Sequence, residues 1–140
     1  MCHHTVPETS KYHRKQASNI KFKTMKITGY KLDKYIEQLD RAIGDANYPK
    51  GDDLMGMSIL RIETDEGITG MAPGGNDAIE SLFHLIEGRD PRGVVGLWKE
   101  MVDWVHKGNN EGAVNAAISA IDVALWDLKA KINDEPLWQT

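Results

Sequence analysis

Residues 117–131 read AISAIDVALWDLKAK, and this stretch decides the fold because its apolar side chains recur at helical spacing. It predicts a long helix over about residues 111–132, whose core-facing stripe is Val114, Ala117, Ile118, Ile121, Leu125, Leu128 and Ile132. Ala116, Ala120 and Ala124 form a second, small-residue stripe. A helix that is apolar on two faces is typical of one packed between two partners. We expect the alanine face to pack against an element outside this chain, although alanine is also simply a good helix former.

Three stretches upstream predict the strands of an antiparallel meander. Residues 26–35 alternate, residues 57–64 form a stronger β-prone run, and residues 68–72 return after a tight turn. Asp65-Glu66-Gly67 suits that turn, because glycine takes a positive φ without strain. The prediction is an α+β fold, with a three-stranded antiparallel meander followed by three helices.

Two shorter helices are predicted between the meander and the long helix. Asn76 can cap the first, and Gly88 can end it. Its buried stripe is Ile79, Leu82, Phe83 and Ile86. Asp90-Pro91 suits the start of the second helix and His106, Lys107 and Gly108 its end, with Asn110 starting the third. The second helix is expected to bury Val94, Leu97, Trp98, Met101 and Val105.

Length and composition exclude several classes of protein. A chain of 140 residues fits one domain and is too short for an eight-stranded βα-barrel, which needs at least about 200 residues. Cys2 is the one cysteine, so no internal disulfide can form and a reducing, cytoplasmic compartment is expected. There is no signal-peptide pattern and no apolar run of about 18 residues. Residues 25–140 carry 12 basic and 20 acidic side chains, which argues against nucleic acid as a partner.

Residues 1–24 carry five basic side chains and one acidic side chain without any apolar periodicity, and they are expected to be a disordered leader. Met25 resembles a natural protein start. The leader is then a vector remnant, a mistaken start or a real extension, and a functional basic arm is the lesser alternative. Cys2-His3-His4 could chelate a stray transition metal, which we regard as incidental.

Polar residues within the predicted helices are expected to be structural. Asp122 and Asp127 lie among apolar neighbours, and a buried carboxylate needs a partner, so we expect hydrogen bonds or ion pairs rather than catalysis. His84 and His106 have no third ligand close in the sequence. Neither histidine therefore predicts a metal site.

Two segments carry a resemblance to a known family. The hairpin RIETDEGITG at residues 61–70 and the helix at residues 117–131 resemble the N-terminal capping domain of the mandelate racemase and muconate lactonizing enzyme group, in the enolase superfamily. The family often continues the hairpin with Trp-Gly-Glu, where this chain has Met71-Ala72-Pro73-Gly74, and commonly has Leu where Thr140 stands. The first departure suggests a subgroup with its own loop chemistry.

The resemblance implies a capping domain over residues 25–135 and the start of a link to a βα-barrel at residues 136–140, with the catalytic barrel absent from this chain. In that superfamily a carboxylate substrate binds Mg²⁺ in the barrel, and a Lys or His takes the α-proton. The ligands and bases lie on barrel strands, so the resemblance assigns no catalytic residue and no metal ligand here. The implied partners are the C-terminal barrel and, in the complete enzyme, further copies of itself.

By the same resemblance, two loops of the capping domain close over the barrel mouth as lids. The first corresponds to residues 36–56, with Tyr48 and Lys50 as candidates for contact with substrate. The second is Pro73-Gly74-Gly75-Asn76, with Asn76 as its candidate, although helix capping is the default role of such a segment. Asp52-Asp53 is interpreted as a solvated turn rather than as an acid/base pair.

The expected function is therefore that of a lid domain, not catalytic by itself, of a Mg²⁺-dependent enzyme that acts on carboxylates. The polar character of the first lid favours an acid-sugar dehydratase. A racemase, epimerase or cycloisomerase of the same superfamily is the alternative. A stand-alone interaction module that docks through the exposed helix stripe, or a non-functional truncated product, are further alternatives.

Overall fold

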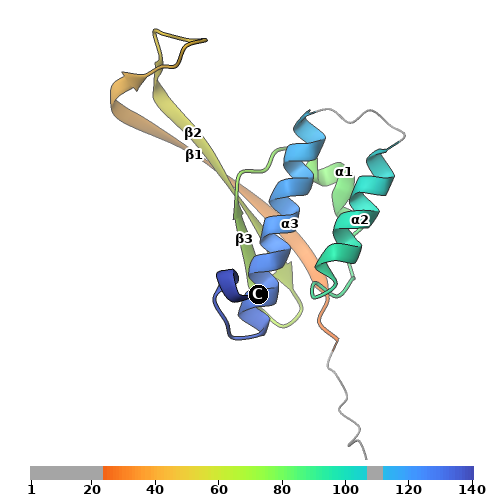
Figure 1. Ribbon diagram of the computed structural model, residues 1–140. Coiled ribbons are helices and arrows are strands. Elements are labelled where there is room, and N and C mark those ends of the chain that lie inside the picture. Colours follow the sequence, from red (N-terminus) through yellow and green to blue (C-terminus); the bar gives the residue numbers. More distant parts are fainter. Residues whose placement is uncertain (1–23, 107–111) are drawn as a thin grey trace, which may run out of the picture.

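Three antiparallel strands in the order β1-β2-β3 form the sheet: β1 (Ile27–Ile43), β2 (Asp52–Thr64) and β3 (Thr69–Pro73). The computed structural model describes residues 24–106 and 112–140. Helices α1 (Ile79–Phe83), α2 (Val94–Val105) and α3 (Gly112–Ile132) follow, and a 3₁₀ turn, η1 (Leu137–Gln139), ends the chain (Figure 1). This order confirms the predicted α+β fold. Almost all of the predicted leader, including Cys2-His3-His4, lies outside the described residues, as do Lys107, Gly108 and Asn110.

The first two strands are longer than predicted. Main-chain pairing between β1 and β2 runs from Ile27 opposite Thr64 to Ile43 opposite Asp52, whereas β3 pairs only with residues 59–63 of β2. Residues 35–57 therefore project from the three-stranded sheet as a two-stranded ribbon, which we call the arm (Figure 1). The predicted loop over residues 36–56 is wrong. The polar run at residues 37–41 coincides with an irregularity in the ladder, because pairing stops at Gln38 opposite Leu54 and resumes at Ile43 opposite Asp52, but the strand itself continues to Ile43.

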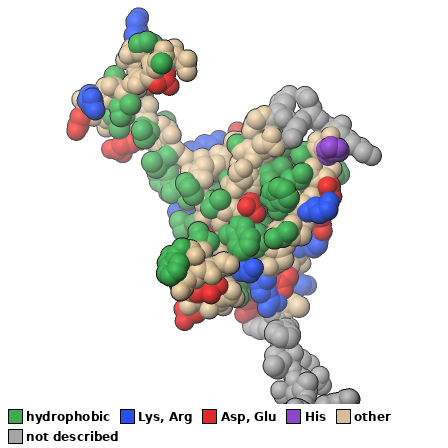
Figure 2. Space-filling view, viewed as in Figure 1, with side chains coloured by type: hydrophobic (Ala, Val, Ile, Leu, Met, Phe, Trp, Pro, Cys, Tyr) green, Lys and Arg blue, Asp and Glu red, His purple; other side chains and the backbone are tan. Residues whose placement is uncertain are grey.

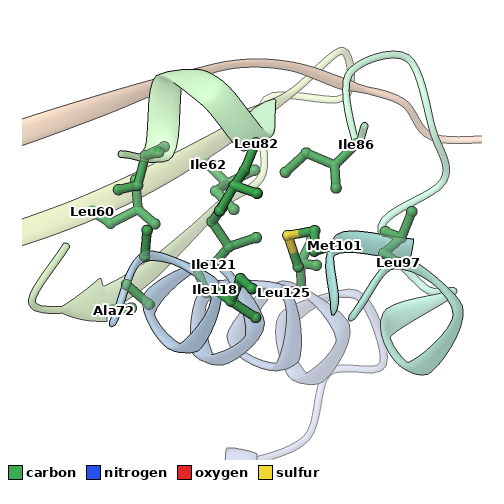
Figure 3. Close-up of a cluster of buried hydrophobic side chains, with 14 of the residues drawn as sticks. Leu60, Ile62, Ala72, Leu82, Ile86, Leu97, Met101, Ile118, Ile121 and Leu125 are labelled. Atoms are coloured by element: carbon green, nitrogen blue, oxygen red, sulfur yellow. The ribbon is translucent and has the colours of Figure 1, made fainter. Parts of the chain in front are cut away.

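The core lies between the sheet and the helices, and its α3 side matches the predicted stripe. Figure 3 shows Leu60 and Ile62 of β2 facing Ile121 and Leu125 of α3, and all four side chains are fully buried. Leu82 of α1 and Met101 of α2, each 0% exposed, close the same cluster. Burial of each such side chain contributes about 1.5–3 kcal/mol, so this cluster is the main source of stability.

Helix α2 departs from its prediction at two points. It begins at Val94, because Asp90 accepts a hydrogen bond from the Arg92 N–H at 3.0 Å within a preceding turn. Trp98 is 44% exposed although it was expected in the core. Helix α2 buries Val94, Leu97, Met101 and Val105, and Trp98 falls on the flank of that stripe.

Helix α1 is shorter than predicted. It ends at Phe83, and residues 84–88 form turns that lead to Gly88 with a φ of 73°. The helix therefore ends before Gly88, the residue that was expected to end it. Ile79, Leu82 and Ile86 are nevertheless buried as predicted.

The alanine stripe of α3 is mostly covered by this chain's own sheet. Ala124 is 0% exposed and Ala120 is 5% exposed, whereas Ala116 is exposed. Strand β3 approaches α3 so closely that a Cβ on Gly70 would lie 2.2 Å from the Ala124 carbonyl oxygen and 2.5 Å from Leu128 Cγ. The expectation of a partner from outside the chain is therefore wrong for Ala120 and Ala124, because the small side chains admit β3 instead.

Two charged side chains of α3 hold the free edge of β3. Asp127 Oδ2 accepts a hydrogen bond from the Met71 N–H at 2.8 Å, and Lys131 Nζ donates one to the Thr69 carbonyl at 2.9 Å. The two side chains also pair with each other at 2.5 Å. They occupy main-chain groups that an edge strand would otherwise offer to another chain. The structural role predicted for Asp127 is thereby confirmed.

The first prediction concerns the close approach at Gly70. Gly70→Ala should lower the free energy of unfolding by about 3 kcal/mol, because the added methyl group collides with the α3 backbone. Urea denaturation followed by circular dichroism measures the change. Gly56→Ala is the matched strand control, since its Cβ would meet nothing within 4 Å. Equal effects of the two substitutions would contradict the packing described here.

The second prediction concerns the edge contact made by Asp127. Asp127→Ala should destabilise the chain by about 1–2 kcal/mol, because it removes a charge-assisted hydrogen bond to the main chain together with an ion pair. Asp103→Ala breaks an exposed pair with Lys99 on α2 and should cost less than about 0.5 kcal/mol. Thermal unfolding compares the two variants, and a larger loss for Asp103→Ala would refute the role of Asp127.

Candidate functional site

An open hollow of about 350 Å³ lies where the arm leaves the sheet. Three segments line it: residues 34–36 of β1, residues 56–58 of β2, and residues 75–77 just before α1. Its lining residues are Lys34, Tyr35, Ile36, Gly56, Met57, Ser58, Gly75, Asn76 and Asp77. The hollow thus joins the base of the arm to the second predicted lid.

Ser58 and the glycines fix the second lid against β2. The Gly74 N–H donates to the Ser58 carbonyl at 2.7 Å, and the Ser58 hydroxyl donates to the Gly75 carbonyl at 2.8 Å. Gly75 has a φ of 101°, and a Cβ there would lie 3.0 Å from the side chains of both Leu32 and Ile79. A glycine is required at this position, and the lid backbone is held in place.

Asn76 uses its side chain to connect elements. Its Oδ1 accepts from the Ala78 N–H at 2.9 Å, and its Nδ2 donates to the Ala113 carbonyl at 2.9 Å. Helix α1 begins at Ile79, so Asn76 forms a turn before the helix rather than its cap residue. The amide thereby ties the second lid to the first turn of α3.

Charges near the hollow are paired but exposed. Lys34 Nζ lies 2.9 Å from Asp77 Oδ1, with both side chains largely in solvent. Asp33, beside it in β1, forms an ion pair with Arg61 of β2. Sequence reasoning missed Lys34, Tyr35 and Ser58 as lining residues, because it placed the first two inside a plain strand. Their proximity to Asn76 depends on the strand register, which the sequence does not specify.

Tyr48 and Lys50 lie at the opposite end of the arm. The turn that holds them is closed by Asp45, whose carboxylate accepts hydrogen bonds from the Asn47 and Tyr48 N–H groups, both at 2.8 Å. The structure therefore brings neither residue together with Asn76. Asp52 and Asp53 are exposed, as expected, but they begin β2 rather than form a turn. The Asp52 carboxylate accepts a hydrogen bond from the Leu54 N–H at 3.1 Å.

The arm is less polar than the sequence analysis assumed. Seven of its large hydrophobic side chains are exposed: Tyr35, Ile36, Ile43, Tyr48, Leu54, Met55 and Met57. Figure 2 shows hydrophobic groups along the projecting arm and over the body of the domain. A surface of this kind suits contact with another protein surface as well as with a small molecule.

Asp122 has no partner, contrary to expectation. It is half-buried on α3, and burial raises the pKa of its carboxyl. Its carboxylate makes no hydrogen bond or ion pair within residues 24–106 and 112–140. The helical positions three and four residues away hold Ile118, Ser119, Leu125 and Trp126, so no basic side chain is in reach along the helix.

In the part of the chain that the structure describes, no group of three or more His, Cys, Asp or Glu side chains could hold a metal ion. Over the same residues, no helix is both long and apolar enough to cross a membrane.

Comparisons with known proteins find one matching family and several similar solved structures. The sequence model for the mandelate racemase / muconate lactonizing enzyme N-terminal domain matches residues 54–140. The structure of the 3,6-anhydro-D-galactonate cycloisomerase from Zobellia galactanivorans is similar, with 29% identity and a TM-score of 0.63 over 77% of this chain and 29% of that chain.

Two further solved structures show the same fold. An enolase from Bradyrhizobium, complexed with magnesium and mandelic acid, has 22% identity and a TM-score of 0.70 over 84% of this chain and 35% of its own. An L-talarate/galactarate dehydratase variant, liganded with Mg and L-glucarate, has 21% identity and a TM-score of 0.69 over 96% and 37%. The chain thus spans only about a third of the length of these proteins.

The third prediction follows from the isolated carboxylate of Asp122. Burial raises the pKa of the Asp122 carboxyl in the folded state, so its protonated form favours folding. This contribution to the free energy of unfolding is fully present below the unfolded pKa of about 3.9 and is lost as the pH rises through the folded pKa. Asp122→Asn should therefore raise the melting temperature of the monomer at neutral pH, and the gain should vanish in acid. Thermal melts of dilute protein across this pH range test it. A gain that grows as the pH falls would contradict the assignment.

Proposed function

Because this chain belongs to the family of mandelate racemase and muconate lactonizing enzyme N-terminal domains, we propose that it is the lid of a Mg²⁺-dependent enzyme acting on carboxylates. The observation that carries the proposal is the hollow shared by the arm base and the Gly75–Asp77 segment. Two segments that the family resemblance designates as lids meet there. The catalytic partner is a C-terminal βα-barrel, as the partial coverage of the solved relatives suggests.

Within this proposal the hollow binds the end of the substrate that is remote from the reaction. The Lys34 ammonium can bind an anionic or hydroxyl oxygen, and the remaining amide proton of Asn76 can donate to another. The Tyr35 ring offers an apolar wall. Closure of the arm over a barrel mouth would exclude water from the reacting atoms and hold the substrate in place.

Tyr48 and Lys50 act at a different point in this proposal. They lie at the tip of a paired ribbon rather than in a long loop, so they can reach a substrate only as the whole arm moves or as a partner surface meets its tip. We assign them contact with the substrate or with the barrel rim. Asn76 is assigned to the hollow itself.

The described part of the chain is not assigned a magnesium site in this proposal. Structures of relatives contain it, but residues 24–106 and 112–140 supply no set of ligands for it. We therefore derive no catalytic step through the metal from these residues. Their part is limited to binding, orientation and exclusion of water.

A sugar acid is the substrate class we favour, and dehydration the reaction. Support comes from the polar groups of the hollow and from the 29%-identical cycloisomerase, whose name specifies a galactonate derivative. That same relative makes cycloisomerisation the principal alternative reaction, followed by racemisation or epimerisation. The single cysteine in the sequence favours a reducing, cytoplasmic compartment.

A chimeric enzyme tests the proposed function. Residues 25–140 would replace the N-terminal domain of the L-talarate/galactarate dehydratase, and Mg²⁺ binding by calorimetry would establish that its barrel remains folded. The chimera should dehydrate a sugar acid. A chimera that binds Mg²⁺ like its parent but turns over none of a panel of sugar acids would contradict the assignment to this substrate class.

The fourth prediction concerns Lys34 in that chimera. Lys34→Met should raise KM about tenfold with a smaller change in kcat, because it removes one charged contact to the distal end of the substrate. Lys99→Met, on the exposed face of α2, is the matched control and should leave both constants unchanged. A Lys34→Met enzyme with the parent KM would show that the hollow does not bind substrate.

A further inference from the structure

Each of the three strands contains one glycine, and one of these glycines has no structural reason. Gly70 of β3 is required by the close approach of α3. Gly29 of β1 lies at an irregularity of the β1–β2 ladder, where glycine is frequent, and a Cβ there would lie 3.6 Å from the Glu63 carboxylate. At Gly56 of β2 the φ is not positive, the ladder is regular, and an added Cβ would meet nothing within 4 Å.

Gly56 therefore weakens its strand without a compensating contact in the described chain. Glycine inside a strand is destabilising because it loses more conformational freedom on folding and has no side chain to pack. Its cross-strand partner, Ile36, is 75% exposed, since no side chain opposite covers it. A strand glycine of this kind often marks a place where a ligand or another backbone approaches closely.

The open space at Gly56 belongs to the hollow. Side chains two residues apart in a strand point to the same face of the sheet, so a side chain at position 56 would share the face of Ser58. The Ser58 hydroxyl is directed at the Gly75 carbonyl, to which it donates at 2.8 Å. A side chain at position 56 would therefore project into the hollow, which Gly56 and Gly75 both line.

The walls around this space suit a carbon chain that carries hydroxyl groups. Ile36 presents apolar atoms directly opposite Gly56. A hydroxyl group beside them can accept a hydrogen bond from the Lys34 ammonium and donate one to the Asp77 carboxylate, because these two groups lie together at 2.9 Å. An apolar wall with a few convergent polar groups is typical of a small-molecule site.

We propose that Gly56 sets the length of the acid that the enzyme accepts, because the missing side chain leaves room for the distal carbons of an open-chain sugar acid. This inference rests on the proposed lid function, in which the other end of the acid reacts in the barrel. A longer acid would collide with any larger side chain at position 56. A shorter acid ends before it reaches the hollow, so its binding does not depend on this residue.

Gly56→Val in the chimeric dehydratase tests the proposal, with galactarate as the long substrate and tartrate, a shorter homologue, as a competitive inhibitor. The substitution should raise KM for galactarate about tenfold, with a smaller rise for Gly56→Ala, and should leave the inhibition constant of tartrate unchanged. Gly96→Val is the matched control, because a Cβ on this exposed glycine of α2 also meets nothing within 4 Å. It should leave both constants unchanged.

Urea denaturation of the 140-residue chain distinguishes exclusion of substrate from damage to the fold. Gly56→Val should leave the urea midpoint unchanged or raise it, because valine favours strands and glycine does not. A lower midpoint would show that the fold requires Gly56 and would overturn the proposal.

The kinetic outcomes separate this inference from the proposed function. An unchanged KM for galactarate would overturn the inference alone. Equal losses for galactarate and tartrate would also overturn it, because they would show that the barrel rather than the substrate fills the space at Gly56. A chimera that turns over no sugar acid before any substitution would contradict the proposed function, and this inference with it.

Discussion

The contact between Gly70 and the backbone of α3 is the constraint on which the rest of the structure depends. No side chain separates β3 from Ala124, so helix and strand approach at main-chain distance. Asp127 and Lys131 then bind the edge of β3 on both sides of that point. With the position of α3 fixed, Asn76 can reach its first turn, and the segment that lines the hollow is held between β2 and α3.

The contact between β3 and α3 also explains why no strand or helix covers the arm. Helix α3 and strand β3 pack only against the end of the sheet nearest the β2–β3 turn, and β3 ends at Pro73, opposite Ile59. Beyond that point β1 and β2 continue with no third strand, and their apolar side chains stay in solvent. An isolated two-stranded ribbon is only marginally stable in water, so the arm is the part of the domain most dependent on a partner.

Sequence reasoning predicted the elements whose cause is local. The apolar stripe from Val114 to Ile132 predicted α3, and Gly67 predicted the hairpin turn. Sequence reasoning was wrong where contacts between distant parts of the chain determine the structure. Strand β1 continues past the polar run at residues 37–41, because its pairing with β2 resumes at Ile43 after an irregularity. The small side chain of Ala124 admits β3 rather than an outside partner.

The hollow could not be predicted from sequence for a similar reason. Lys34, Ser58 and Asn76 are far apart in the chain; strand register places Lys34 opposite Ser58, and hydrogen bonds between Ser58 and the Gly74–Gly75 segment bring Asn76 beside them. Asp122 showed the opposite failure: its burial among apolar residues was foreseen, but the partner that burial normally requires was absent from the described residues.

Hydrogen exchange resolved to single residues tests the central claim most directly. If the contact of β3 with α3 is the anchor of the fold, the amides of Met71, Leu60 and Ile62 should exchange only through global unfolding, while those of the arm at residues 36–43 and 52–56 should exchange much faster through local opening. Uniform protection along the whole of β1 and β2, or a Met71 amide that exchanges as fast as the arm, would contradict the account.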